Sequence, residues 1–163
     1  MLRPALPLVI VVLILTALSG CGSGDQQTGT TGGGGLDRAA LAARANAICA
    51  KYRSRFLDIS LPTDLTDLKA VARYAADSHS LFQERHAELA ALTPDATAAP
   101  RWKAFIAANR KTTDVLGELE AAARAKDVTA MANVTTKSQT LLQQGLAAAD
   151  AAGATGCGSK AAG

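Results

Sequence analysis

Residues 37–60, DRAALAARANAICAKYRSRFLDIS, form the segment that decides the fold. Apolar residues recur through it at intervals of three or four, namely Leu41, Ala45, Ile48, Tyr52, Phe56 and Ile59. This spacing places them on one face of an α-helix. Asp37 follows a run of glycines and is the predicted N-cap. Leu61-Pro62 predicts the end of the helix, because the residue before a proline disfavours helical backbone.

Three further helical segments follow, at about residues 64–92, 99–125 and 128–152. Helix formers such as Ala, Leu, Arg and Glu dominate them, and no stretch alternates apolar and polar residues as a half-buried strand would. Ser78 and Arg85 interrupt the apolar face of the first of the three. Short loops between four helices favour antiparallel neighbours. The sequence therefore predicts an all-α domain, an antiparallel up-down four-helix bundle.

The ends of these helices carry local signals. Thr63 or Asp64 is the predicted N-cap of the second helix, and Pro100 suits the first turn of the third, where no N–H is needed. We expect Asp127 to cap the fourth helix and Gly153 to end it. The apolar face of that helix is thin and consists of Val128, Met131, Val134, Ser138, Leu142, Gly145 and Ala149. A three-helix body with a loosely docked fourth segment is therefore the alternative.

The first twenty residues have a different character. Met1–Arg3 is positive and Pro4–Leu18 is apolar, about 15 residues long and shorter than the roughly 20 of a spanning helix. This pattern is typical of a secretory signal. It ends in Leu18-Ser19-Gly20-Cys21, which resembles the lipobox of bacterial lipoprotein precursors. The resemblance implies lipidation of the Cys21 thiol and cleavage before it. A plain secretory signal or an uncleaved anchor is the alternative.

The predicted domain organisation follows from these segments. Residues 1–20 are the cleaved signal, and residues 21–35 are the lipidated cysteine with a Gly/Ser/Thr-rich tether. Such a tether is a flexible coil that spans roughly 20 Å. Residues 36–158 form the helical bundle, and residues 159–163 are expected to be a disordered tail.

With Cys21 lipidated, Cys49 and Cys157 are left as an even pair. The signal places both outside the cytoplasm, where disulfides persist. In an up-down bundle the fourth helix returns toward the start of the first, so that the tail after Gly153 can reach Cys49. A bridge would close a loop of about 100 residues, worth up to about 4–5 kcal/mol in the chain-entropy model. A reactive thiol or a metal ligand is the alternative, although no CxxC motif supports it.

A second resemblance concerns the same cysteines. The segment Ala45-Asn46-Ala47-Ile48-Cys49, with Cys157-Gly158 near the C-terminus, is similar to motifs of small all-helical actinobacterial lipoproteins of uncharacterised function. The resemblance supports the cysteine pairing and the helical fold. It implies no activity and no role for Asn46.

Residues that could carry catalysis or bind metal are sparse. His79 and His86 are the only histidines. They are seven residues apart, about 10.5 Å along a helix, which is too far to share one metal ion. Together with Asp77, Glu84 and Glu88 they are interpreted as a solvated polar face. HExxH, paired ExxH and GxSxG motifs are absent, so the sequence predicts no catalytic residue, metal or cofactor.

Composition and charge narrow the function further. The 163 residues are 48% hydrophobic and 19% charged, with a net charge of +3. These values predict one folded domain and disfavour nucleic-acid binding. Basic residues outnumber acidic ones on the first helix, at Arg38, Arg44, Lys51, Arg53 and Arg55. This face is a candidate for contact with anionic lipid. The alternative is a soluble helix with a basic outer face.

The expected function combines these points. We expect a lipid-anchored lipoprotein on the outer face of the plasma membrane that acts as a helical binding or scaffolding module of the cell envelope. The alternative is a small-ligand or haem-type binder, or an enzyme, that uses the interior of the bundle. The partner and the oligomeric state are not specified by the sequence.

Overall fold

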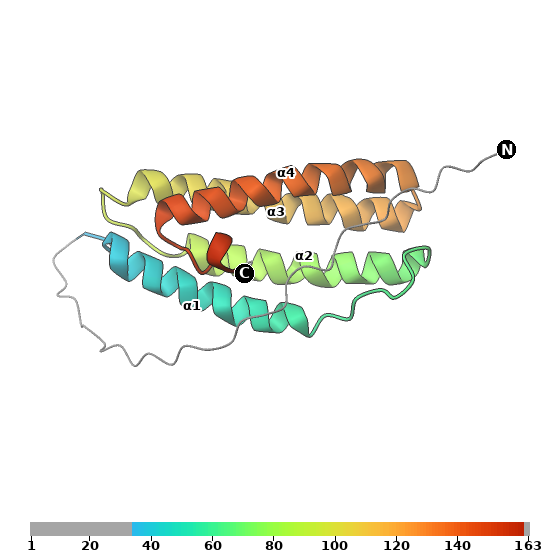
Figure 1. Cartoon of the computed structure of the whole chain (residues 1–163), viewed down its shortest axis with the longest axis horizontal. Helices are drawn as coiled ribbons and strands as arrows, with labels where there is room; N and C mark the ends of the chain where they lie inside the picture. Colours follow the sequence, from blue (N-terminus) through green and yellow to red (C-terminus); the bar gives the residue numbers. More distant parts are fainter. Residues whose placement is uncertain (1–33, 162–163) are drawn as a thin grey trace.

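The computed structural model describes residues 34–161, so Cys21 and the expected signal and tether lie outside the described part. Four helices follow one another, α1 (Arg38–Leu57), α2 (Leu68–Ala90), α3 (Ala99–Ala125) and α4 (Val128–Ala152), before a short 3-10 helix, η1 (Ser159–Ala161). In Figure 1, α1 and α2 form one antiparallel pair that lies against a second pair, α3 and α4. The predicted all-α four-helix bundle is confirmed.

The predicted start of the second helix is wrong. The helix begins at Leu68, and its N-cap is Asp67, whose carboxylate accepts hydrogen bonds from the N–H groups of Lys69 and Ala70. Asp64 instead accepts from the N–H and hydroxyl of Thr66, at 2.8 and 2.7 Å. A side chain that bonds backbone two residues ahead stabilises a turn in competition with the helix. The connection between α1 and α2 is therefore longer than the sequence indicates.

Three of the signals predicted at other helix ends are confirmed. Asp37 caps α1 through the N–H of Ala40, and Asp127 caps α4 through the N–H of Ala130, both at 2.8 Å. Gly153 ends α4 with a φ of 86°, in the left-handed region that glycine adopts without strain. α1 itself stops at Leu57, three residues before the predicted end.

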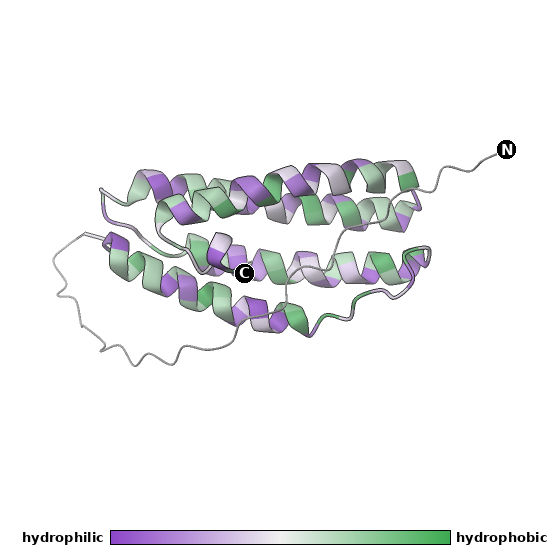
Figure 2. Ribbon diagram, in the orientation of Figure 1, coloured by the Kyte–Doolittle hydropathy of each residue, from purple (hydrophilic) through white to green (hydrophobic). Residues whose placement is uncertain are grey.

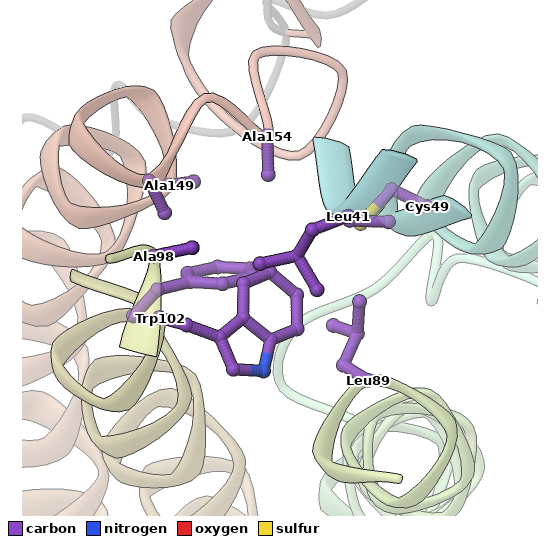
Figure 3. Close-up of a cluster of buried hydrophobic side chains, with 10 residues drawn as sticks. Leu41, Cys49, Leu89, Ala98, Trp102, Ala149 and Ala154 are labelled. Atoms are coloured by element: carbon purple, nitrogen blue, oxygen red, sulfur yellow. The ribbon is translucent and has the colours of Figure 1, made fainter. Parts of the chain in front are cut away.

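The main core lies at the end of the bundle where α1 begins. Figure 3 shows the indole of Trp102 enclosed by Leu41, Leu89, Ala98 and Ala149. Trp102 stacks edge-on against Phe105, with ring centroids 5.2 Å apart. Most other members of the core are alanines, which bury little area each. Figure 2 accordingly shows short hydrophobic patches broken by hydrophilic ones along every helix.

The predicted apolar face of α4 is only partly correct. Val134 and Ala149 are buried, but Val128 and Leu142 are 65% and 48% exposed. α4 nevertheless packs closely along α3, so the alternative of a loosely docked fourth segment is wrong. α1 and α4, by contrast, approach each other at few points.

The chain enters the bundle beside the loop between α2 and α3. Leu36 donates to the carbonyl of Thr93 and accepts from the N–H of Asp95, both at 2.7 Å. Gly35 lies so close to this loop that a Cβ there would be 2.2 Å from the carbonyl oxygen of Pro94. The entry point is therefore fixed at one end of the bundle, and the connection between α1 and α2 lies at the opposite end (Figure 1).

Two further features concern the described residues as a whole. Between residues 34 and 161, no helix is both long and apolar enough to cross a membrane.

The tail expected to be disordered from residue 159 is helical through Ala161. The N–H of Ser159 donates to Asp150, and the N–H of Ala161 donates to the carbonyl of Gly158.

We predict that Asp127→Ala lowers the free energy of unfolding by about 1 kcal/mol, the usual cost of losing an N-cap. Urea unfolding monitored by circular dichroism measures the change. Asp77→Ala is the matched control, because Asp77 lies exposed inside α2 and caps nothing. Equal stabilities of the two variants would contradict the capping role.

Candidate functional site

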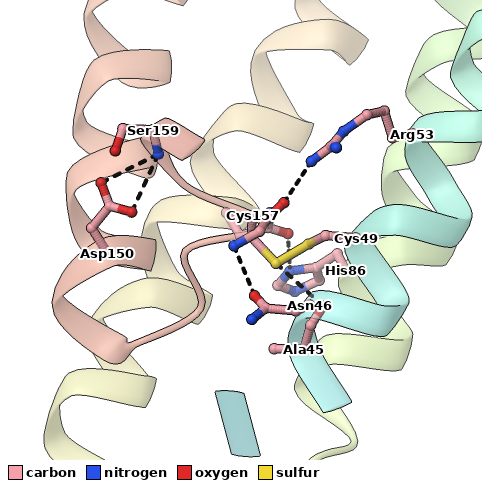
Figure 4. The surroundings of a disulfide bond; sticks show 10 residues. Ala45, Asn46, Cys49, Arg53, His86, Asp150, Cys157 and Ser159 are labelled. Carbon is pink, nitrogen blue, oxygen red and sulfur yellow. Dashed lines mark hydrogen bonds between the residues drawn. A yellow bond between two sulfur atoms is a disulfide. The ribbon is translucent and has the colours of Figure 1, made fainter. Parts of the chain in front are cut away.

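The two cysteines predicted to pair form a disulfide in the structure. Cys49 of α1 and Cys157 are joined across 108 residues of sequence, with their Cα atoms 5.3 Å apart. Figure 4 shows the segment after α4 crossing to α1, where the bond forms. In this bonded state neither cysteine offers a thiol or a metal ligand. Cys21, the predicted lipid attachment site, lies outside the described residues.

Asn46 acquires a structural role at this crossing. Its side-chain oxygen accepts a 2.8 Å hydrogen bond from the N–H of Gly156, while Arg53 donates to the carbonyl of the same glycine, also at 2.8 Å. A Cβ on Gly156 would lie 2.9 Å from the Asn46 oxygen. Asn46 and Cys49, three residues apart on α1, thus hold the same turn (Figure 4). The motif around Asn46 is explained by architecture without invoking chemistry.

The same segment is also held from α4. The carboxylate of Asp150 accepts from the N–H of Ser159, with both oxygens at 3.2 Å (Figure 4). Gly158 lies directly against Asp150, with no room for a side chain. The turn over residues 153–158 is therefore anchored to α4 on one side and to α1 on the other.

The basic face of α1 is partly neutralised within the bundle. Lys51 pairs with Glu88 and Arg55 with Glu84, each at 2.6 Å. Tyr52 also donates to Glu88, at 2.7 Å, and the hydrogen bonds from Lys51 and Tyr52 hold the pKa of Glu88 below its usual value. α1 therefore presents less unpaired positive charge than its sequence indicates.

The interpretation of the histidines as a solvated polar face is wrong. His79 and His86 both point toward α3 and are only partly exposed. His79 lies 3.3 Å from a Glu120 oxygen, and His86 lies 3.1 Å from the side-chain oxygen of the buried Asn109. Gly117 makes room for the His79 ring, since a Cβ there would be 2.9 Å from it. The two histidines thus belong to the contact between α2 and α3.

The structure does not bring chemistry-bearing residues into a metal centre. No group of three or more His, Cys, Asp or Glu side chains suited to a metal ion occurs among residues 34–161. The described residues do form a surface with a pocket and exposed apolar side chains.

Such a surface lies at the connection between α1 and α2, and we call it the distal end. It holds a pocket of about 450 Å³, whose walls include Ile59, Leu61, Pro62, Arg73, Tyr74 and Asp77. Leu57 and Leu61 are each 61% exposed and Leu65 is 49% exposed. Three of the five exposed large apolar residues of the described chain are thus gathered within nine positions. The sequence does not reveal this surface, because the segment between the first two helices carries only the signals of a helix break.

Comparisons with known proteins add no functional assignment. No protein-family model, curated protein or solved structure matches the chain.

We predict that reduction of the disulfide lowers the free energy of unfolding by up to about 4–5 kcal/mol, because the bond closes a loop of roughly 100 residues in the unfolded chain. Urea unfolding with and without dithiothreitol measures the difference. A double variant, Cys49→Ser with Cys157→Ser, is the control and should not respond to the reductant. Two titratable thiols at these positions in the native, unreduced protein would contradict the bridge.

Proposed function

We propose that the chain is a lipid-anchored binding module of the bacterial cell envelope, attached to the outer face of the plasma membrane through Cys21, and that it presents its distal end to a partner protein. The lipobox-like sequence before Cys21 supports the anchor. The observation that carries the binding role is the pocket of the distal end, with its exposed leucines.

The position of the entry point supports this orientation. The chain joins the bundle at Leu36, beside the loop between α2 and α3. α1 then runs for 20 residues, about 30 Å, before the distal end is reached. A lipid on Cys21 would hold the entry end near the membrane through a tether that spans roughly 20 Å. The distal end is then the part of the bundle best placed to meet an envelope protein.

The chemistry of the distal end favours a protein partner. Exposed apolar side chains next to a hollow are typical of surfaces that receive a side chain from another protein. Charged residues, among them Arg73 and Asp77, border the hollow and would form the polar rim of such an interface. A small ligand in the same pocket is the alternative, because the volume lies within the range of ligand sites.

The basic face of α1 receives a smaller part in this proposal. Two of its five basic residues already pair with carboxylates of α2. Membrane attachment is therefore assigned to the lipid, and contact with anionic lipid is at most a secondary role of this face. Two acyl chains are sufficient for stable anchoring without a basic patch.

We predict that Cys21→Ala releases the protein from the membrane fraction or leaves an uncleaved precursor, because the thiol is the proposed site of lipidation. Fractionation of expressing cells and intact mass measurement distinguish the outcomes. Cys157→Ser is the control and should remain lipidated and membrane-bound. An unchanged fractionation and mature mass for Cys21→Ala would contradict the anchor.

We predict that a photo-cross-linking amino acid at position 61 captures one discrete partner in intact cells, because Leu61 is exposed and lines the pocket. The same residue at position 142 is the matched control, since Leu142 is also apolar and exposed but lies on α4. The position 61 adduct should disappear when Leu57 and Leu65 are both replaced by serine. Identical adducts at positions 61 and 142 would contradict a specific surface.

A further inference from the structure

Arg85 occupies a core-facing position of α2. It shares a helical face with Ser78 and Leu89, which are 1% and 0% exposed. The Nε of Arg85 is shielded from solvent and has no hydrogen-bond partner. No carboxylate within residues 34–161 forms an ion pair with it.

No ion pair among the described residues compensates the charge of Arg85, whose side chain is partly buried and whose Nε is shielded from solvent. Burial lowers the pKa of its guanidinium to about 10, so the group stays cationic at neutral pH. The nearest acidic residues along α2 are already used, since Glu84 binds Arg55 and Glu88 binds Lys51. A buried cation is unfavourable unless an anion pairs with it. The described residues do not supply that anion.

The surroundings of the guanidinium are aromatic. Its central carbon lies 4.1 Å from the centroid of the Phe82 ring. Phe82 meets Phe56 of α1 edge to face, with centroids 5.9 Å apart, and Phe56 meets Tyr74 in the same way at 6.3 Å. Ser78, on the same face of α2, has a buried hydroxyl that also lacks a partner. The position thus combines unused donors with an apolar wall.

This combination specifies the chemical class of a ligand. The Nε–H and one terminal N–H of a guanidinium form a fork that matches the two oxygens of a carboxylate. A single cation balances a single negative charge, and backbone N–H groups in the middle of a helix are already bonded and cannot bind a second one. The aromatic wall suits an apolar body attached to the carboxylate.

We propose that Arg85 anchors the carboxylate of an amphipathic monocarboxylic acid, whose apolar part packs on Phe82 and Phe56 inside the bundle. Arg85, Phe82 and Phe56 do not line the pocket of the distal end, although Phe56 contacts Tyr74 of that pocket.

Titration of the chain from residue 21 onward, with Cys21→Ser, tests the proposal. It retains every described residue. Sodium decanoate is the probe, with decanol as the neutral analogue and acetate and inorganic phosphate as anions without an apolar body. We expect decanoate to shift the NMR signal of the Arg85 Nε–H, and Arg85→Gln to weaken decanoate binding about tenfold or more. Arg110→Gln is the matched control, because Arg110 is an exposed arginine of α3, and should bind as the parent does.

The outcomes decide the proposal. Equal decanoate affinity in Arg85→Gln and the parent, or no shift of the Nε–H signal, would overturn it. Acetate or phosphate binding as tightly as decanoate would overturn the assignment of an apolar body, and decanol binding equally well would overturn the role of the carboxylate. Thermal unfolding provides a second readout, since removal of an uncompensated charge in Arg85→Met should raise Tm in the absence of ligand. A lower Tm would indicate a structural role and count against the proposal.

Discussion

The bundle is closed on its weakest side by a covalent bond. α2 packs closely on α3 and α3 on α4, whereas α1 approaches α4 at few points. The segment that follows α4 fills this side and is joined to α1 through Cys49 and Cys157. Asn46 and Asp150 fix the same segment by hydrogen bonds from opposite sides. An alanine-rich core buries little area per residue, so a constraint on the unfolded chain matters more here than in a bundle with large side chains.

A pair of polar side chains links each helix of the bundle to the next one along the chain. Lys51 and Glu88 join α1 to α2, His86 and Asn109 join α2 to α3, and Lys137 and Glu118 join α3 to α4. Pairs that are mostly exposed contribute little stability, but they favour one alignment of neighbouring helices over others. Arg85 departs from this pattern, because it is charged, partly buried and without an ion-pair partner among the described residues, and its Nε is shielded from solvent. A charged residue at a position where the pattern of the helix calls for an apolar one is the kind of exception expected at functional sites.

The two ends of the bundle serve different purposes in this interpretation. The end at Leu36 carries the chain entry and the main core around Trp102. The distal end has a longer connection, whose exposed leucines are not needed by the core. The main core thus lies at one end, and the other end exposes apolar side chains to solvent. The proposed interior site at Arg85 lies between them, where aromatic rings replace aliphatic packing.

The sequence by itself determined the number of helices, their approximate bounds and most caps, because 3–4 periodicity and capping are local properties of the chain. The pairing of Cys49 with Cys157 was predicted differently, from the even number of cysteines left once Cys21 is assigned to the lipid and from the return of the fourth helix toward the first. Prediction from sequence failed where a side chain can form either of two local hydrogen-bonding arrangements. Asp64, for example, accepts a hydrogen bond from Thr66 in a turn instead of capping α2. It also failed where burial depends on a neighbouring helix, as for His86, which faces Asn109, and for Leu142, which stays exposed. Arg85 was visible only as an interruption of an apolar face. Tertiary structure alone decided which faces meet and which charges lack a partner, because both depend on residues far apart in sequence.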